Sequence, residues 1–205
     1  MEIKALSPNR IINFWEWFST NYKNFGESFE NEELLGELDR LITGLGNFAW
    51  ELGPGIQAAN MLIVSPGGQI ELLSQTKEIV SYAPNIEDWE FHYAKPQKQW
   101  DDFIFDIYRD NGEKVEINAS SWRYALLKYN DGMFGIIIKA DLTELTTEEQ
   151  ITAAEILLDG VLGEEKRILT IAEIEVVTEF EEQYVNKGND IKTLAEHITK
   201  LNNHN

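Results

Sequence analysis

The sequence predicts an α+β protein built around an antiparallel sheet. Helical patterns do not alternate regularly with strand patterns, as they would in a doubly wound parallel sheet. The turn sequences Asp110-Asn111-Gly112 and Asn130-Asp131-Gly132 separate successive strand-like segments, and such turns are typical of antiparallel hairpins. No proline- or serine-rich linker divides the chain, so we expect one continuous domain over residues 1–205.

Both ends of the chain are predicted to be helical. Residues 1–46 form a predicted helical hairpin, because apolar residues recur at helical spacing over Pro8–Tyr22 and again over Glu30–Leu45. A capping serine and a proline precede the first stripe, and glycines follow the second. A terminal helix is predicted at residues 189–202, where isoleucines and leucines again keep helical spacing.

Residues 47–180 are predicted to hold the sheet and two helices packed on it. Alternating apolar and polar residues or short apolar runs indicate strands, and apolar residues spaced three and four apart indicate helices. Four successive strands from Phe103 to Ala140 form a predicted central meander. The expected helices are Ile70–Ala83 and Thr146–Leu162, and the expected strands are Phe48–Leu52, Met61–Ser65, Trp89–Ala94, Phe103–Tyr108, Lys114–Asn118, Ser121–Tyr129, Phe134–Ala140 and Ile168–Val177.

The composition excludes several classes of protein. The chain has 17 Lys and Arg against 36 Asp and Glu, a net charge of −19, which disfavours nucleic acid because phosphate binding needs a concentrated positive field. The absence of cysteine excludes disulfides, thiolate nucleophiles and cysteine-bound metals. The first ten residues lack the apolar core of a secretory signal, and no stretch approaches the roughly 18 apolar residues of a membrane span. We therefore expect a cytoplasmic protein without membrane contact.

Catalytic and metal-binding motifs are weak. Glu90 and His92 project from one strand face, either as an acid–base pair or as an ordinary polar face opposite aromatic residues. Asp101 and Asp102 could bind a hard cation, but EF-hand spacing is absent and Asp110 suits the hairpin turn better. We therefore expect no catalytic, cofactor or metal site. A hydrolase that uses carboxylates or the Glu90–His92 pair is the alternative.

A protein-binding role has more support. Trp17 lies out of phase on its helix and Trp100 lies in a polar loop, and exposed tryptophans often anchor interfaces. Residues Asp141–Glu182 carry a net charge of −11, which indicates either a solvated surface or a surface for a cationic partner. We expect a non-catalytic, acidic domain that binds a basic protein. The alternative within binding is an immunity- or antitoxin-like protein that neutralises a cationic toxin. The candidate binding residues are Trp17, Trp100, Glu148, Glu149, Glu164 and Glu165.

Several short motifs spread over most of the chain resemble those of a group of uncharacterised bacterial proteins. They are Phe14-Trp15-Glu16-Trp17-Phe18, Glu51-Leu52-Gly53-Pro54-Gly55, Ile63-Val64-Ser65-Pro66-Gly67-Gly68, Glu71-Leu72, Ala83-Pro84, Trp89-Glu90-Phe91, Lys95-Pro96 and Leu162-Gly163-Glu164-Glu165. The resemblance implies one bacterial domain and brings no activity or site residue with it. An antitoxin-like or immunity-like role is the expectation that accompanies it.

Overall fold

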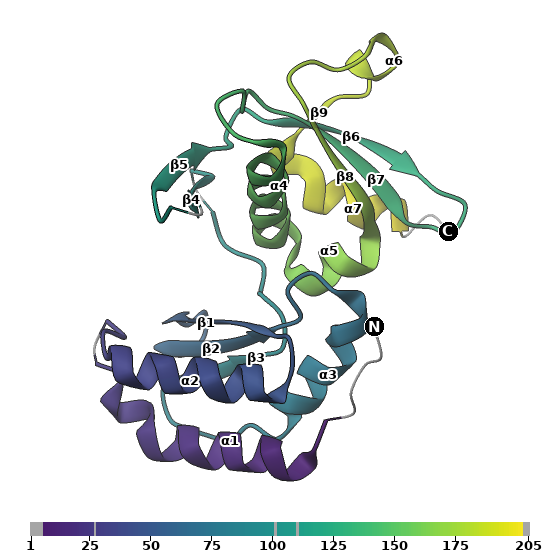
Figure 1. Cartoon of the computed structure of the whole chain (residues 1–205). Helices are drawn as coiled ribbons and strands as arrows, with labels where there is room; N and C mark the ends of the chain where they lie inside the picture. The colour runs from purple at the N-terminus through teal and green to yellow at the C-terminus, as the bar shows by residue number, and fades with distance from the viewer. Residues whose placement is uncertain (1–5, 27, 101, 110, 203–205) are drawn as a thin grey trace. The chain divides into compact units, whose positions relative to one another are not determined.

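The chain packs as two compact units, Met1–Lys95 (unit 1) and Pro96–Asn205 (unit 2). The computed structural model describes residues 6–26, 28–100, 102–109 and 111–202 (Figure 1). Each unit has a hydrophobic core of its own. The α+β class is confirmed: the described residues form three sheets that are mostly antiparallel, an N-terminal helical pair and a C-terminal helix. The single domain over residues 1–205 stays a prediction.

Unit 1 combines a helical pair with a three-stranded sheet of order β1-β2-β3. β1 and β2 are antiparallel, whereas β3 joins β2 in parallel because α3 carries the chain back between them. The elements are α1 (Pro8–Asn21), the 3₁₀ turn η1 (Tyr22–Asn24), α2 (Glu32–Leu45), β1 (Ala49–Pro54), β2 (Asn60–Ser65), α3 (Ile70–Ser81) and β3 (Trp89–His92).

Aromatic side chains from α1 and β3 form the core of unit 1. Phe18 of α1 is fully buried, with the ring centroids of Trp89 and Phe91 at 5.0 and 5.6 Å. Trp15 lies one turn earlier, and its indole N–H donates to the Ile79 carbonyl at 2.7 Å. The alternation of β3 thus turns its aromatic residues toward the helices and leaves its polar residues on the opposite face.

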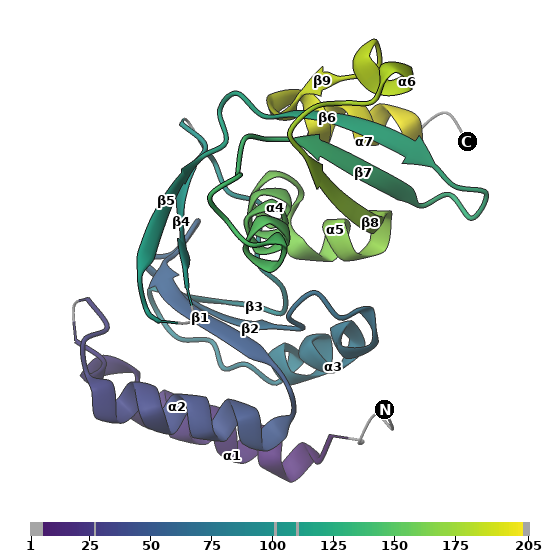
Figure 2. The same ribbon diagram turned by 45° about the horizontal axis from the view of Figure 1, so that its top comes forward.

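Unit 2 places helices against one face of a four-stranded sheet of order β8-β7-β6-β9 (Figure 2). A separate antiparallel pair, β4 and β5, precedes this sheet in the chain. The elements are β4 (Ile104–Tyr108), β5 (Lys114–Asn118), β6 (Arg123–Lys128), β7 (Phe134–Lys139), α4 (Thr147–Leu162), α5 (Glu164–Thr170), β8 (Ile171–Val177), α6 (Glu182–Val185), β9 (Asn189–Asp190), the 3₁₀ turn η2 (Ile191–Thr193) and α7 (Leu194–Asn202).

The four strands predicted as one meander belong to two different sheets. β4 pairs with β5 and β6 pairs with β7, but β5 and β6 are not neighbours in a sheet. The four-stranded sheet is completed instead by β8, which returns in parallel beside β7 after α4 and α5. Ile174 and Val176 of β8 pack against the core of unit 2, so this parallel pairing buries apolar surface.

Two local boundaries also differ from the sequence prediction. The segment that begins at Ile168, predicted as strand, is helical through Thr170, because Gly163 ends α4 in a left-handed conformation (φ 80°) and a second short helix follows. The terminal helix begins at Leu194 rather than near Asp190, since β9 and η2 occupy the first residues of the predicted range.

Candidate functional site

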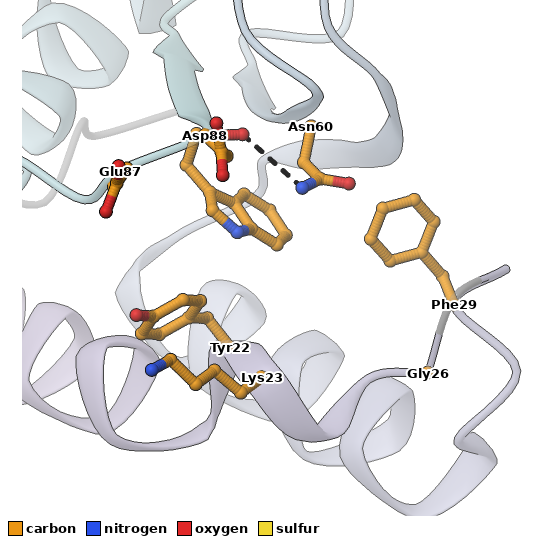
Figure 3. A pocket seen from close by; sticks show the side chains of 8 residues that line it. Tyr22, Lys23, Gly26, Phe29, Asn60, Glu87 and Asp88 are labelled. Atoms are coloured by element: carbon orange, nitrogen blue, oxygen red, sulfur yellow. Dashed lines mark hydrogen bonds between the residues drawn. The ribbon is translucent and has the colours of Figure 1, made fainter.

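Unit 1 contains an open pocket of about 500 Å³ (Figure 3). Its walls come from the 3₁₀ turn η1 that follows α1, the loop after η1, the start of β2, the turn before β3 and the first residue of β3. Asn60 fixes part of one wall, because its side-chain amide donates to the Asp88 carbonyl at 3.3 Å. The lining residues are Tyr22, Lys23, Gly26, Phe29, Asn60, Glu87, Asp88 and Trp89.

The predicted Glu90–His92 pair forms on the polar face of β3. His92 Nε2 lies 3.1 Å from Glu90 Oε1. The same carboxylate accepts the backbone N–H groups of Ile56, Gln57 and Ala58 at 2.6, 2.9 and 3.2 Å, so it holds the loop between β1 and β2. Burial raises the pKa of Glu90, but these hydrogen bonds outweigh it and lower the pKa to about 2. A carboxylate held in this state is a poor general base near neutral pH, and its geometry suits a structural anchor.

The two candidate tryptophans are half-buried and packed against the cores. Trp17 contacts the buried ring of Phe25 at a centroid distance of 6.2 Å, so a residue beyond the end of α1 covers it. Trp100 stacks on Phe105 at 5.7 Å with an interplanar angle of 5°. Both rings therefore contribute to internal packing, and a binding role for either stays a prediction.

Trp100 fits against Gly160, a buried glycine inside α4. A Cβ added at Gly160 would lie 2.5–2.9 Å from atoms of the Trp100 ring. We expect Gly160→Ala to lower the free energy of unfolding by about 1–2 kcal/mol, because overpacking exceeds the gain in helix propensity. Urea unfolding would measure this. Gly36→Ala is the matched control in α2, where an added Cβ meets nothing within 4 Å, and it should stabilise by about 0.5–1 kcal/mol. Equal stabilisation by both changes would contradict the expected clash.

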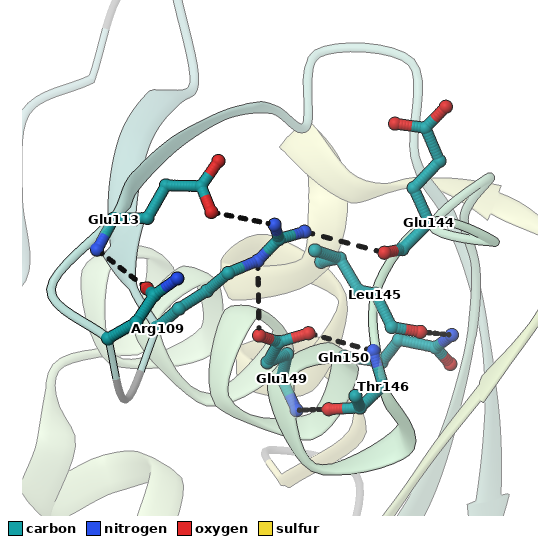
Figure 4. A network of polar contacts seen from close by, with 8 residues as sticks. Arg109, Glu113, Glu144, Leu145, Thr146, Glu149 and Gln150 are labelled. Carbon is teal, nitrogen blue, oxygen red and sulfur yellow. Dashed lines mark hydrogen bonds and ion pairs between the residues drawn. The ribbon is translucent and has the colours of Figure 1, made fainter.

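Glu149 is engaged in an internal network at the start of α4 (Figure 4). It completes a capping box with Thr146, accepting the Thr146 backbone N–H at 2.8 Å while its own N–H donates to Thr146 Oγ1. Arg109, at the end of the β4 strand, reaches Glu149 Oε1 at 3.3 Å and Glu113 Oε2 at 3.1 Å. The Thr146 backbone hydrogen bond, with the help of Arg109, lowers the pKa of Glu149. Its neighbour Glu148 is exposed.

Glu164 and Glu165 lie beyond the other end of α4. Glu164 is buried and Glu165 half-buried in the first turn of α5. α4 has 16 residues and spans roughly 24 Å, so the two predicted acidic pairs lie at opposite ends of one helix. The four glutamates therefore form no common surface.

The outer face of the unit 2 sheet, opposite α4 and α7, was not singled out by the sequence. Strand alternation turns Ile174 and Val176 of β8 into the core and places Glu175 on the outer face. Strand register sets Glu175 beside Ile137, and Ile137 beside Ala125. The outer face is thus apolar at its centre and acidic at one edge.

A groove lies on this outer face, where the chain crosses from β8 toward β9. We call it the outer groove, a hollow of about 160 Å³ that adjoins a second hollow of about 440 Å³. The two hollows share Val177 and Glu181. Glu175 and Glu181 are exposed, and within the described residues neither forms an ion pair with a cation. The outer groove is lined by Leu127, Ile137, Glu175, Val177, Glu181 and Tyr184.

The remaining sequence candidates are the aspartates considered for a hard cation. Within the part of the chain that the structure describes, no three His, Asp or Glu side chains gather as a metal site, and no helix could cross a membrane. Asp101 and Asp110 lie outside the described residues.

Comparisons with protein-family models, with curated proteins and with solved structures find no match. The resemblance to uncharacterised bacterial proteins therefore stays a prediction.

Proposed function

We propose that this protein is a non-catalytic binding protein whose outer groove takes a basic segment of another protein. The observation that carries this proposal is the pair of exposed carboxylates, Glu175 and Glu181, beside an apolar floor and without cation partners in the described part of the chain. An apolar floor supplies affinity through burial, and carboxylates at its rim select lysine and arginine. An immunity-like protein that neutralises a cationic toxin is one form of this function.

The charge of unit 2 supports a basic partner. Residues Asp141–Glu182, which include α4, α5, all of β8 and the start of the crossover to β9, carry a net charge of −11. A field of this sign raises the association rate of a cationic protein and is weakened by salt. We therefore expect the affinity for the partner to fall as ionic strength rises. The cytoplasmic location expected from the sequence stays a prediction.

The hydrolase alternative has less support from the geometry. Its best-placed carboxylate, Glu90, accepts three backbone N–H groups and has a pKa of about 2, far from the range that suits proton transfer near neutral pH. The Glu90–His92 pair is accounted for by its anchoring of the loop between β1 and β2.

Reversing the charges of the outer groove is expected to weaken partner binding strongly. The partner is first isolated by co-purification with the wild-type protein, and its affinity is then measured by calorimetry with purified variants. We expect Glu175→Lys with Glu181→Lys to weaken binding by about tenfold or more, because two attractive contacts become repulsive.

The matched control is Glu144→Lys with Glu148→Lys at the start of α4. Both residues are exposed, and this double variant changes the net charge by the same amount. We expect it to keep the affinity within about threefold, since only the general field weakens. Loss of binding in the control alone would place the partner at the start of α4, and unchanged binding in the groove variant would overturn the proposal.

A further inference from the structure

We propose that the pocket of unit 1 binds an organic cation with a methylated ammonium group. The pocket is lined by the aromatic side chains of Tyr22, Phe29 and Trp89 and by the carboxylates of Glu87 and Asp88. This inference concerns a different unit from the outer groove and does not rest on the proposed function.

Three aromatic rings meet at the pocket at steep angles. The Trp89 ring lies 6.2 Å from Tyr22 at an interplanar angle of 84°, and 5.9 Å from Phe29 at 71°. All three side chains are half-buried, so the core fixes the rings while part of each remains accessible. The face of an aromatic ring is electron-rich, and rings in different planes can present several such faces to one cation.

The charges at the pocket also favour a cation. Glu87 and Asp88 are exposed, and neither makes an ion pair among the residues that the structure describes. Lys23 contributes one positive charge, so the charged lining sums to −1. Figure 3 shows Glu87 and Asp88 at the edge of the pocket across from Tyr22 and Lys23. An anionic ligand would face two carboxylates and one ammonium, which is unfavourable.

Lys23 already occupies one of the cation positions. Its Nζ lies 5.5 Å from the centroid of the Tyr22 ring, which is cation–π distance. Lys23 is exposed and its ammonium forms no ion pair within the described residues. Its position over the Tyr22 ring is therefore only weakly stabilised. A ligand cation would displace it. A methylated ammonium is the better occupant, because a primary ammonium is strongly hydrated and loses more on leaving water.

Two residues of the pocket have unusual backbone conformations. Phe29 (φ 54°) and Asp88 (φ 65°) both lie in the left-handed region, which is costly for a bulky side chain such as phenylalanine. These conformations direct the Phe29 ring and the Asp88 carboxylate to the pocket lining. The strain is therefore located in residues that the ligand would contact.

Titration of the ¹⁵N-labelled full chain tests the proposal. The probes are choline and trimethyllysine, and the control is 3,3-dimethylbutan-1-ol, the uncharged carbon isostere of choline. We expect a saturable shift of the Trp89 indole N–H signal, assigned with Trp89→Phe, and a dissociation constant of about 1 mM. The isostere should bind about tenfold more weakly, because it lacks the charge. Binding of either cation more tightly than the isostere supports the proposal. If choline binds more tightly than trimethyllysine, the natural ligand is a free methylated ammonium compound; the reverse order indicates a methylated lysine side chain.

Charge variants separate this site from an ordinary apolar hollow. Glu87→Gln with Asp88→Asn should weaken choline binding by about fivefold, and asparagine tolerates the left-handed backbone at residue 88. The control, Glu71→Gln with Glu78→Gln on exposed positions of α3, removes the same charge outside the pocket lining and should have little effect.

Lys23→Gln should strengthen choline binding by about two- to fivefold, because it removes a competing cation. Weaker binding in this variant would show that Lys23 does not compete with the ligand cation and would overturn the proposal. Equal affinity for choline and its isostere, or no saturable shift with either cation at about ten times the expected dissociation constant, would overturn it as well.

Discussion

Replacing Phe18 with alanine is expected to lower the free energy of unfolding of unit 1 by about 4 kcal/mol. The side chain is 0% exposed, and four aromatic rings surround it with centroids 5.0–5.9 Å away. Removing the ring leaves a cavity between α1 and β3 that these rigid neighbours cannot fill, so both the burial and the ring contacts are lost. Hydrogen exchange of amides in residues 6–95, measured by mass spectrometry, gives the change for this unit alone.

The control for this cavity lies on the same helix. Ile12 of α1 is 40% exposed, and we expect Ile12→Ala to change the free energy of unfolding by about 1 kcal/mol or less. A loss below about 1 kcal/mol for Phe18→Ala would show that the aromatic cluster repacks, which would contradict the close packing described for unit 1.

Replacing Glu90 with glutamine is expected to cost about 3 kcal/mol at pH 7. Glutamine keeps the shape but offers one acceptor oxygen to the three backbone N–H groups of residues 56–58. The Glu90 pKa falls from an ordinary value of 4.5 to about 2 in the folded protein, so its contribution is fully present above pH 4.5. That contribution is lost as the pH falls toward 2. Urea unfolding of both proteins between pH 7 and pH 2 should therefore show a difference that shrinks below pH 4.5.

The neighbouring Glu87 provides the comparison for Glu90. It is exposed, and Glu87→Gln should change the free energy of unfolding by less than about 0.5 kcal/mol at any of these pH values. If Glu90→Gln cost the same at pH 7 and pH 3, the carboxylate would not be acting through its charged form, and the anchoring account would be wrong.

Local sequence patterns predict most helices and strands but not which strands pair. The hairpin turn at Asn130-Asp131-Gly132 correctly joins β6 and β7, because its glycine at φ 89° suits a tight turn. No local sequence pattern predicts that β8 pairs with the other side of β7, because α4 and α5 separate the two strands in the chain. The unbroken apolar run of β7 does carry a signal. Such a run indicates a strand covered on both faces, and Ile137 on the outer face is only 5% exposed.

The candidate sites depend on contacts between distant residues. Glu175 and Leu127 line the outer groove together although 48 positions separate them in the sequence, so periodicity within one element cannot reveal the groove. Helical phase correctly marks Trp17 as lying off the main apolar stripe, yet Phe25 from beyond the helix covers it. The Glu90–His92 pair was predicted, because both residues lie on one strand. The loop that engages Glu90 was not, because no pattern in β3 indicates it.

The two-residue length of β9 leaves an open strand edge in unit 2. β9 pairs only with Arg123 and Tyr124, so in the described part of the chain the backbone of residues 125–128 has no neighbouring strand on that side. Such edges invite pairing with a second molecule, which is a route to aggregation. Lys128 is exposed at the end of this edge, where a charged side chain opposes the approach of another strand. We infer that the charge of Lys128 disfavours self-association of the protein through this strand edge.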